Sequence, residues 1–154
     1  MKTLAIALLM AAAASSASEP AGFNLWKSTD LANVERKLTS EMGAQKIAMQ
    51  VLASYGNHSC MIAHRNADGE AELHETQNDV FFVHSGEGTL VIGGKVVKPH
   101  TTAPHEVRGP SIEGGERRTL TPGDIVHIPV KIPHQMLVAP GHQITYFVVK
   151  INAQ

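Results

Sequence analysis

The sequence predicts an all-β domain preceded by a single helix. From residue 46 onward, about nine short segments rich in β-branched and aromatic residues follow one another. Turn residues such as Asp68-Gly69 and Gly93-Gly94 separate them, as expected for hairpins. No helical pattern alternates with these segments, and apolar residues recur at helical spacing only before residue 44. This order of elements is typical of an antiparallel sandwich or barrel.

Residues 1–17 have the pattern of a signal peptide. A short positive start at Met1-Lys2 precedes an apolar run from Leu4 to Ala14, and small residues follow at Ser15-Ser16-Ala17. The run is too short to remain as a stable membrane anchor. We therefore expect a periplasmic or secreted protein with no membrane anchor after cleavage. The alternative is an apolar helix packed on the domain.

Residues 18–45 are predicted to form an irregular lead-in and one helix. Ser28 is a good N-cap and Asp30 lies in the first turn, whereas Gly43 ends the apolar pattern. One face of this helix carries four apolar residues at helical spacing: Leu31, Val34, Leu38 and Met42. We interpret this stripe as a packing face.

Residues 46–154 are predicted to form the β-barrel. The expected strands are 47–55, 59–65, 71–75, 80–83, 89–92, 95–98, 117–120, 125–128, 135–138 and 143–151. Between two of them, the stretch 99–116 is rich in Pro and Gly, contains His100 and His105, and has no clear periodicity. We expect a long loop there, either an excursion over the barrel mouth or a plain surface loop.

The composition excludes several classes of protein. With 154 residues, 43% hydrophobic and 18% charged, the chain suits one globular domain. The net charge of −1 and the lack of a basic run argue against a nucleic-acid partner. Cys60 is the only cysteine, so no intramolecular disulfide is possible, and we expect a buried thiol.

Chemistry-bearing residues gather in two segments. All nine histidines lie between residues 58 and 142. Glu72 and His74 are two residues apart, so on a strand their side chains leave the same face. Asp79 opens the following strand, and a turn bounded by prolines precedes His134. Because imidazole and carboxylate groups are common metal ligands, these four residues are candidates for a metal site.

The two segments resemble the two motifs of the cupin family. The stretch from Glu72 to Gly88 is similar to the first motif, G-x5-H-x-H-x3,4-E-x6-G. His74 matches its second histidine, Asp79 its glutamate and Gly86 its closing glycine.

The second cupin motif, G-x5-P-x-G-x2-H-x3-N, is matched by Gly123, Pro129 and His134. Lys131 replaces its second glycine and Val138 its asparagine. The resemblance covers about half of the chain, roughly residues 71–149. It implies a cupin-type double-stranded β-helix, that is, a jelly-roll barrel with one N-terminal helix.

The resemblance also implies one divalent metal ion on Glu72, His74, Asp79 and His134. Family members use three histidines and one glutamate, whereas here Glu72 replaces the first histidine. Two carboxylates would favour Mn, Fe or Zn over a soft ion. With only one carboxylate bound, the set becomes the two-histidine, one-carboxylate arrangement with open positions. Alternatively, Glu72 stays free beside the ion as a catalytic general base.

Apolar residues around such a site would line a substrate pocket. We expect Phe81, Met136 and Phe147 inside the barrel, with His64 as a further contact to substrate. By strand alternation His84 and His127 should point outward. Outward apolar residues such as Val80 and Phe82 suit a homodimer.

Three hypotheses of function follow from these expectations. The first is a metal-dependent enzyme of the dioxygenase, isomerase or lyase type that acts on a small-molecule substrate. The second is a non-catalytic module that binds a small ligand or a metal. The third is a structural dimer with a vestigial site. Because one fold supports many chemistries, the resemblance alone does not select among them.

Overall fold

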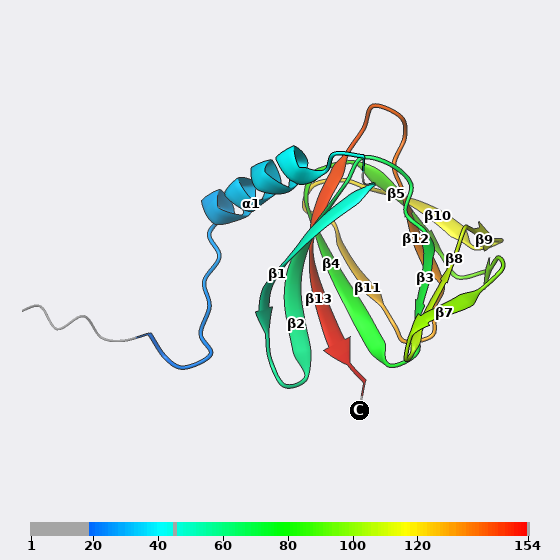
Figure 1. Ribbon diagram of the computed structural model, residues 1–154, viewed down its shortest axis with the longest axis horizontal. Helices are drawn as coiled ribbons and strands as arrows, with labels where there is room; N and C mark the ends of the chain where they lie inside the picture. The colour runs from blue at the N-terminus through cyan, green and yellow to red at the C-terminus, as the bar shows by residue number, and fades with distance from the viewer. Residues whose placement is uncertain (1–18, 45, 154) are drawn as a thin grey trace, which may run out of the picture.

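The computed structural model describes residues 19–44 and 46–153, so the predicted signal peptide lies outside the described residues. In this part of the chain, one helix, α1 (Ser28–Glu41), precedes thirteen strands. Two antiparallel sheets face each other, and a two-stranded ribbon lies beside the second (Figure 1). The predicted β fold with one N-terminal helix is confirmed. Over the described ranges, no helix is long and apolar enough to cross a membrane.

The first sheet has five strands in the order β1-β2-β13-β4-β11. Its members are β1 (Ile47–Ser54), β2 (His58–Arg65), β4 (Gln77–Gly86), β11 (Ile125–Ile128) and β13 (Ile144–Asn152). The last strand, β13, lies between β2 and β4 and is antiparallel to both. This register places Lys150 directly opposite Asp79.

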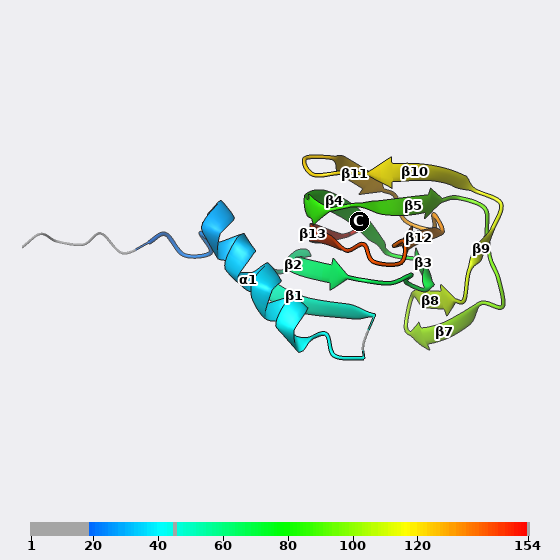
Figure 2. The same cartoon turned by 90° about the horizontal axis from the view of Figure 1, so that it is seen from above.

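The second sheet has six strands in the order β10-β5-β12-β3-β8-β7. Its members are β3 (Ala71–His74), β5 (Gly88–Ile92), β7 (His100–Ala103), β8 (Glu106–Gly109), β10 (Glu116–Leu120) and β12 (His134–Leu137). The ribbon pairs β6 (Lys95–Val96) with β9 (Ile112–Glu113). In Figure 2 the first sheet lies on the side of helix α1, and most of the second sheet lies on the side away from it.

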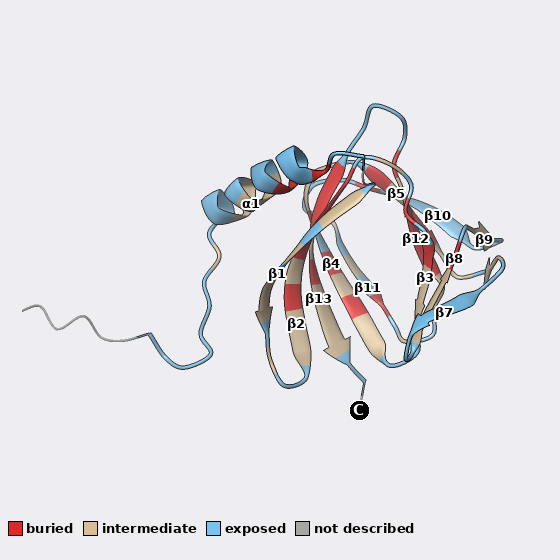
Figure 3. Cartoon of the chain, in the orientation of Figure 1, coloured by how far each residue is buried: buried red, intermediate tan, exposed pale blue. Residues whose placement is uncertain are grey.

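The core fills the space between the two sheets. Buried stretches recur on the central strands of both layers (Figure 3). Phe81 and Val83 of β4, Leu90 of β5 and Val148 of β13 belong to one cluster of buried side chains. These residues alternate with outward ones, as expected for strands with one buried face. The core therefore fixes which side chains point into the space between the sheets.

Helix α1 packs against β1 and β2 at one end of the first sheet (Figure 1). Leu38 and Met42 are buried there, as the predicted stripe requires. The N-cap is Lys27 and not the expected Ser28, because the Asp30 carboxylate accepts the Lys27 backbone N–H at 3.0 Å. This acidic residue in the first turn suits the positive end of the helix dipole.

The stretch 99–116 is not the loop that was predicted. It contains β7, β8 and β9, and β8 extends the second sheet by pairing with β3. The pairing places Glu106 opposite His74 and Arg108 opposite Glu72. The prediction was wrong because strands of only two to four residues are too short to show a clear alternation of apolar and polar residues.

Candidate metal centre

Four side chains converge between the two sheets, and they are the four predicted ligands. Glu72 and His74 come from β3, and His134 opens β12 directly opposite Glu72. Asp79 comes from β4 of the facing sheet. His74, Asp79 and His134 are at most 3% exposed, so the group is screened from bulk water. We call these four residues the ligand cluster.

The spacing of the donor atoms fits one ion. Nε2 of His74 lies 3.5 Å from a Glu72 carboxylate oxygen and 3.3 Å from an Asp79 oxygen. Nε2 of His134 lies 3.7 Å from the same Asp79 oxygen. Donor atoms of Glu72, His74 and His134 all lie within 4.8 Å of one another. Ligands bound tetrahedrally at about 2.0–2.2 Å are separated by roughly 3.4 Å, close to these values.

Both imidazole rings present Nε2 to the centre. Nδ1 of His134 donates to the backbone carbonyl of Ile132 at 3.1 Å, which leaves the lone pair on Nε2. This Nε2 is buried and has no hydrogen-bond partner among the residues that the structure describes. Burial lowers the pKa of His134 against the opposing effects of Glu72 and other neighbours, so the ring stays neutral. A neutral ring with an unpaired, buried nitrogen is the state that a metal ion needs.

Glu106 orients the other ring. Nδ1 of His74 lies 2.8 Å from both Glu106 carboxylate oxygens, so Nδ1 donates and Nε2 keeps the lone pair. A carboxylate behind a ligating histidine fixes its tautomer and raises its basicity. The sequence-based prediction missed Glu106 because it lies in the stretch expected to be a loop.

Two arginines hold Glu72 in its ionised form. Arg65 lies 3.1 Å and Arg108 3.4 Å from its carboxylate oxygens. Burial alone would raise the pKa of Glu72, but the positive charges of Arg108 and Arg65 help to outweigh it and lower the pKa. A carboxylate with a lowered pKa is a weak general base. This environment favours Glu72 as a ligand over Glu72 as the catalytic base.

Lys150 also reaches the ligand cluster, and the prediction did not include it. Its ammonium lies 2.9 and 3.0 Å from the two Asp79 oxygens and 2.9 Å from Nε2 of His74. Burial raises the pKa of Asp79, but its neighbours His74 and Lys150 lower it overall. Asp79 is therefore ionised, and the Lys150 ammonium uses the His74 lone pair that a metal would need.

A pocket of about 300 Å³ opens beside the ligand cluster. Charged side chains from Arg65, Glu72, Arg108 and Lys150 form its inner wall. Ile47, Met49 and Met61 supply an apolar side. A site that combines an apolar wall with a few convergent charged groups suits a small organic ligand.

The predicted pocket residues are separated by the fold. Phe81 lies near the centre, with its ring 6.3 Å from that of His134. Met136 is buried in the core cluster and does not line the 300 Å³ pocket. Phe147 lies on the outer face of the first sheet, where it packs against Trp26 at 5.9 Å. Its neighbour Tyr146 takes the inward position and accepts a hydrogen bond from Arg65 at 2.8 Å.

His64 also lies away from the cluster, contrary to the expected substrate contact. It is buried under α1, with Nδ1 2.8 Å from Thr145 Oγ1 and Nε2 3.4 Å from Thr39 Oγ1. The next residue, Arg65, faces the pocket instead. The alternation along β2 was predicted correctly, but the face assigned to the barrel interior was the outer one.

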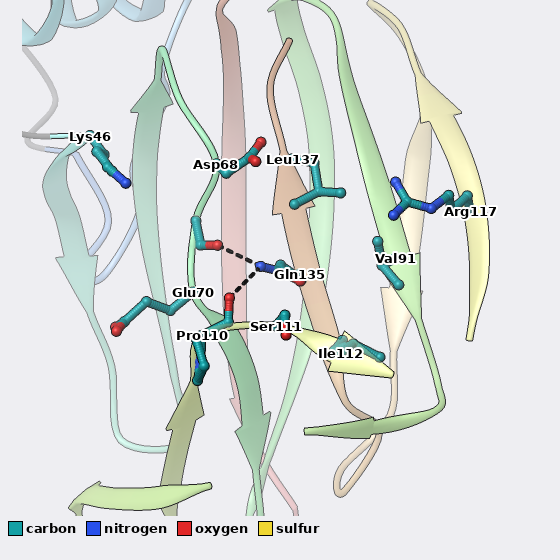
Figure 4. A pocket seen from close by; sticks show the side chains of 11 residues that line it. Lys46, Asp68, Glu70, Val91, Pro110, Ser111, Ile112, Arg117, Gln135 and Leu137 are labelled. Atoms are coloured by element: carbon teal, nitrogen blue, oxygen red, sulfur yellow. Dashed lines mark hydrogen bonds between the residues drawn. The ribbon is translucent and has the colours of Figure 1, made fainter. Parts of the chain in front are cut away.

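A larger hollow, about 570 Å³, lies against Gln135 and Leu137 of β12 (Figure 4). It adjoins the 300 Å³ pocket, with which it shares Lys46, Asp68, Gly69 and Glu70. Gln135 forms part of its wall and donates to the carbonyls of Gly69 and Pro110 at 2.8 and 3.3 Å (Figure 4). Its amide is thus used to tie two segments together. None of the four residues of the ligand cluster lines this hollow, whereas Glu72 lines the smaller pocket.

Solved structures place this architecture among cupin folds. A cupin-like protein from Thermotoga maritima matches with a TM-score of 0.50 and 16% identity, covering 68% of this chain and 68% of that one. The polyketide cyclase RemF from Streptomyces resistomycificus matches with a TM-score of 0.51 and 16% identity, covering 71% of this chain and 67% of that one. The chain therefore has a cupin-type jelly-roll fold.

The DMSP lyase DddQ from Ruegeria pomeroyi matches with a TM-score of 0.50 and 17% identity over 70% of this chain. This chain covers 48% of that lyase, about half its length. No family model and no curated protein sequence matches the chain significantly. At such identities the likeness shows the fold, while the chemistry has to be argued from the residues of the site.

Proposed function

We propose that this protein is a metal-dependent enzyme that acts on a small organic substrate. One divalent ion, Mn, Fe or Zn, would be held by Glu72, His74, Asp79 and His134. The observation that carries the proposal is the buried, unpartnered Nε2 of His134, which faces the same space as Nε2 of His74. Leaving such an atom without a partner is costly unless a ligand or metal takes it.

The bound ion would supply Lewis acidity toward a carbonyl or carboxylate group, or a site for O₂. The chain's own residues orient the metal ligands and bind the substrate. Glu106 and the Ile132 carbonyl hold the two rings in one tautomer. Arg65 and Arg108 keep Glu72 ionised, and the pocket beside them receives the substrate. A reaction of the dioxygenase, isomerase or lyase type fits this arrangement.

Metal analysis tests the proposal. The protein is purified without chelator and without a His-tag, and its metal content is measured per chain. We expect about one equivalent, lost in a His74→Ala, His134→Ala double variant. A His127→Ala, His142→Ala double variant is the control, because both rings are exposed and outside the cluster. Wild-type protein without metal, even after incubation with Mn²⁺, Fe²⁺ and Zn²⁺, would contradict the proposal.

One observation favours a second candidate, a non-catalytic module that binds a small ligand without metal. The Lys150 ammonium already pairs with Asp79 and His74. These contacts of Lys150 stabilise the ligand cluster without a metal ion. This candidate predicts saturable binding of a small organic ion by metal-free protein and no conversion of that ligand.

We also propose export of the mature chain to the periplasm or the medium, on the order of charged, apolar and small residues in 1–17. N-terminal sequencing of protein recovered from cell fractions tests it. A new N-terminus at Ser18 outside the cytoplasm is expected, and an intact Met1 would contradict it. The homodimer through Val80 and Phe82 stays a prediction, although Phe82 is 44% exposed as that contact requires.

A further inference from the structure

Lys150 occupies the place where the proposed metal would bind. It projects from β13 toward the ligand cluster, directly opposite Asp79. Its ammonium contacts Asp79 at 2.9 and 3.0 Å and Nε2 of His74 at 2.9 Å. The Nε2 atom has one lone pair, because Nδ1 carries the proton donated to Glu106. That lone pair cannot accept from Lys150 and bind a metal ion at the same time.

The charges around the cluster are balanced without a metal. Three cations, Arg65, Arg108 and Lys150, are linked by ion pairs to three carboxylates, Glu72, Asp79 and Glu106. The further charges at the pocket rim, Lys46, Asp68 and Glu70, are exposed and screened by water. A divalent ion added to the balanced set leaves an excess of positive charge. An anionic substrate would remove that excess.

We propose that Lys150 is a displaceable cation: it fills the metal position in the metal-free protein and, once a divalent ion displaces it, binds a carboxylate-bearing substrate. This inference rests on the proposed metal function and names a substrate class for the same site. Lysine suits the role because its charge sits on a flexible four-carbon stem.

The pocket beside the ligand cluster can receive the displaced Lys150 ammonium. The Lys150 side chain is 19% exposed and lines the 300 Å³ pocket together with Arg65 and Arg108. Because Lys150 already lines this pocket, rotation about its flexible stem is enough to turn the ammonium toward it. There it would face a substrate carboxylate beside Arg108, while the apolar side of Met49 and Met61 receives the rest of the molecule. Charge-assisted hydrogen bonds of this kind are strong and orient the ligand.

Mn²⁺ titration of three full-length proteins tests the displacement. Lys150→Met removes the competing ammonium, and Lys150→Gln removes its charge but keeps a donor for Asp79. Lys46→Met is the matched control, since Lys46 lines the same pocket but lies at its exposed rim. We expect both Lys150 variants to bind Mn²⁺ about tenfold or more tightly than wild type, and Lys46→Met to bind like wild type.

The outcomes separate the two proposals. If wild type binds Mn²⁺ and the Lys150 variants bind it equally or less well, the displacement is wrong and the metal function stands. If only the Lys150 variants bind Mn²⁺, the displacement is supported and the metal function of the natural chain is refuted. If none of the proteins binds Mn²⁺, both proposals are refuted.

A measurement on wild type keeps the test independent of variant folding. Acetic anhydride labels free amines, and mass spectrometry reports the modification of each lysine. Metal loading should increase labelling of Lys150 relative to Lys46, because the ammonium leaves its ion pair. Unchanged or decreased labelling would overturn the displacement.

The substrate class is tested with succinate and acetate as probes. Calorimetry of Mn²⁺-loaded wild type should show binding of at least one of them, weakened about tenfold in Mn²⁺-loaded Lys150→Met. Equal binding to both proteins, or to neither, would overturn the role of Lys150 as a carboxylate anchor.

Discussion

Nδ1 of His74 donates to the carboxylate of Glu106, and the two residues are 32 positions apart in the chain. The pairing of β3 with β8 brings them together. Through this pairing Glu106, which lies in a stretch with no clear periodicity, orients the ring of the predicted ligand His74. Because the ring nitrogen that faces Glu106 must carry the proton, the other nitrogen is free to face the centre.

Removing this support should weaken metal binding. We expect Glu106→Ala to lower metal affinity about 10–100-fold, the usual effect of removing a carboxylate behind a ligating histidine. Titration of the protein with the metal ion in a calorimeter measures the change in affinity. Glu75→Ala is the matched control, because it breaks a Glu–His pair with His105 that lies at the surface. Equal affinities for the two variants would show that Glu106 does not support the site.

The role of Glu72 can be decided by Glu72→Gln. Because two arginines lower its pKa, we expect the carboxylate to act as a ligand. Loss of its charge should reduce metal affinity by about tenfold or more. Metal analysis after dialysis gives the result. A variant that retains metal but loses turnover would instead identify Glu72 as the general base.

Thr145 links helix α1 to the first sheet, and its loss should destabilise the protein. Its hydroxyl donates to Glu35 at 2.9 Å and lies 2.8 Å from Nδ1 of buried His64. Thr145→Val keeps the volume but leaves Nδ1 of His64 without its partner, so we expect a loss of about 1–3 kcal/mol in the free energy of unfolding. Urea denaturation measures it. Glu116→Ala, which breaks an exposed pair with Arg118, should change stability little.

Stability should also depend on pH through His64. Burial lowers the pKa of His64, and Glu35 offsets this only in part. The unfolded chain, with a pKa of about 6.5, therefore binds this proton more readily than the native state. The stabilisation is complete above about pH 6.5 and is lost as the pH falls through the lowered native pKa.

His64→Gln should accordingly show a smaller loss of stability between pH 7 and pH 5 than wild type. Urea denaturation at both values gives the difference, with His127→Gln, an exposed histidine, as the control. Parallel curves for wild type and His64→Gln would exclude this residue as the source.

Gly86, the closing glycine of the first motif, should be intolerant of any side chain. Its φ is +74°, and a Cβ atom would overlap the carbonyl oxygen of Gln143. Gly141 has a similar φ of +80° but open space around it. We expect Gly86→Ala to cost about 2–4 kcal/mol more than Gly141→Ala, because only the first adds a clash to the backbone strain. Thermal unfolding compares them, and equal losses would disprove the clash.

The sequence predicted the strands and the ligand cluster because both leave local signals. Turns such as Asp68-Gly69 end strands at defined positions, and the spacing of His74, Asp79 and His134 follows a known motif. The spacing of Glu72 and His74 needed only strand geometry. The turns and the spacing within each motif depend only on neighbours in the chain, whereas the expected meeting of His134 with His74 came from the resemblance to the two motifs.

The partners of the cluster were missed because they meet it through tertiary contacts. Glu106 and Arg108 lie opposite His74 and Glu72 only through the register of β3 and β8, and Arg65 reaches Glu72 from the facing sheet. Lys150 left one readable signal, since it shares the inward face with Tyr146 and Val148, at a spacing of two residues, on a mostly apolar strand. The face of His64 and Phe147 could not be read, because alternation separates two faces without saying which is inside.

X-ray absorption at the edge of the bound metal tests the central claim most directly, namely that His74 and His134 bind one ion. The spectrum of the wild-type metal complex should show two imidazole ligands with oxygen completing the shell, and His134→Ala should show one. A spectrum with no imidazole, or one unchanged by His134→Ala, would contradict the site.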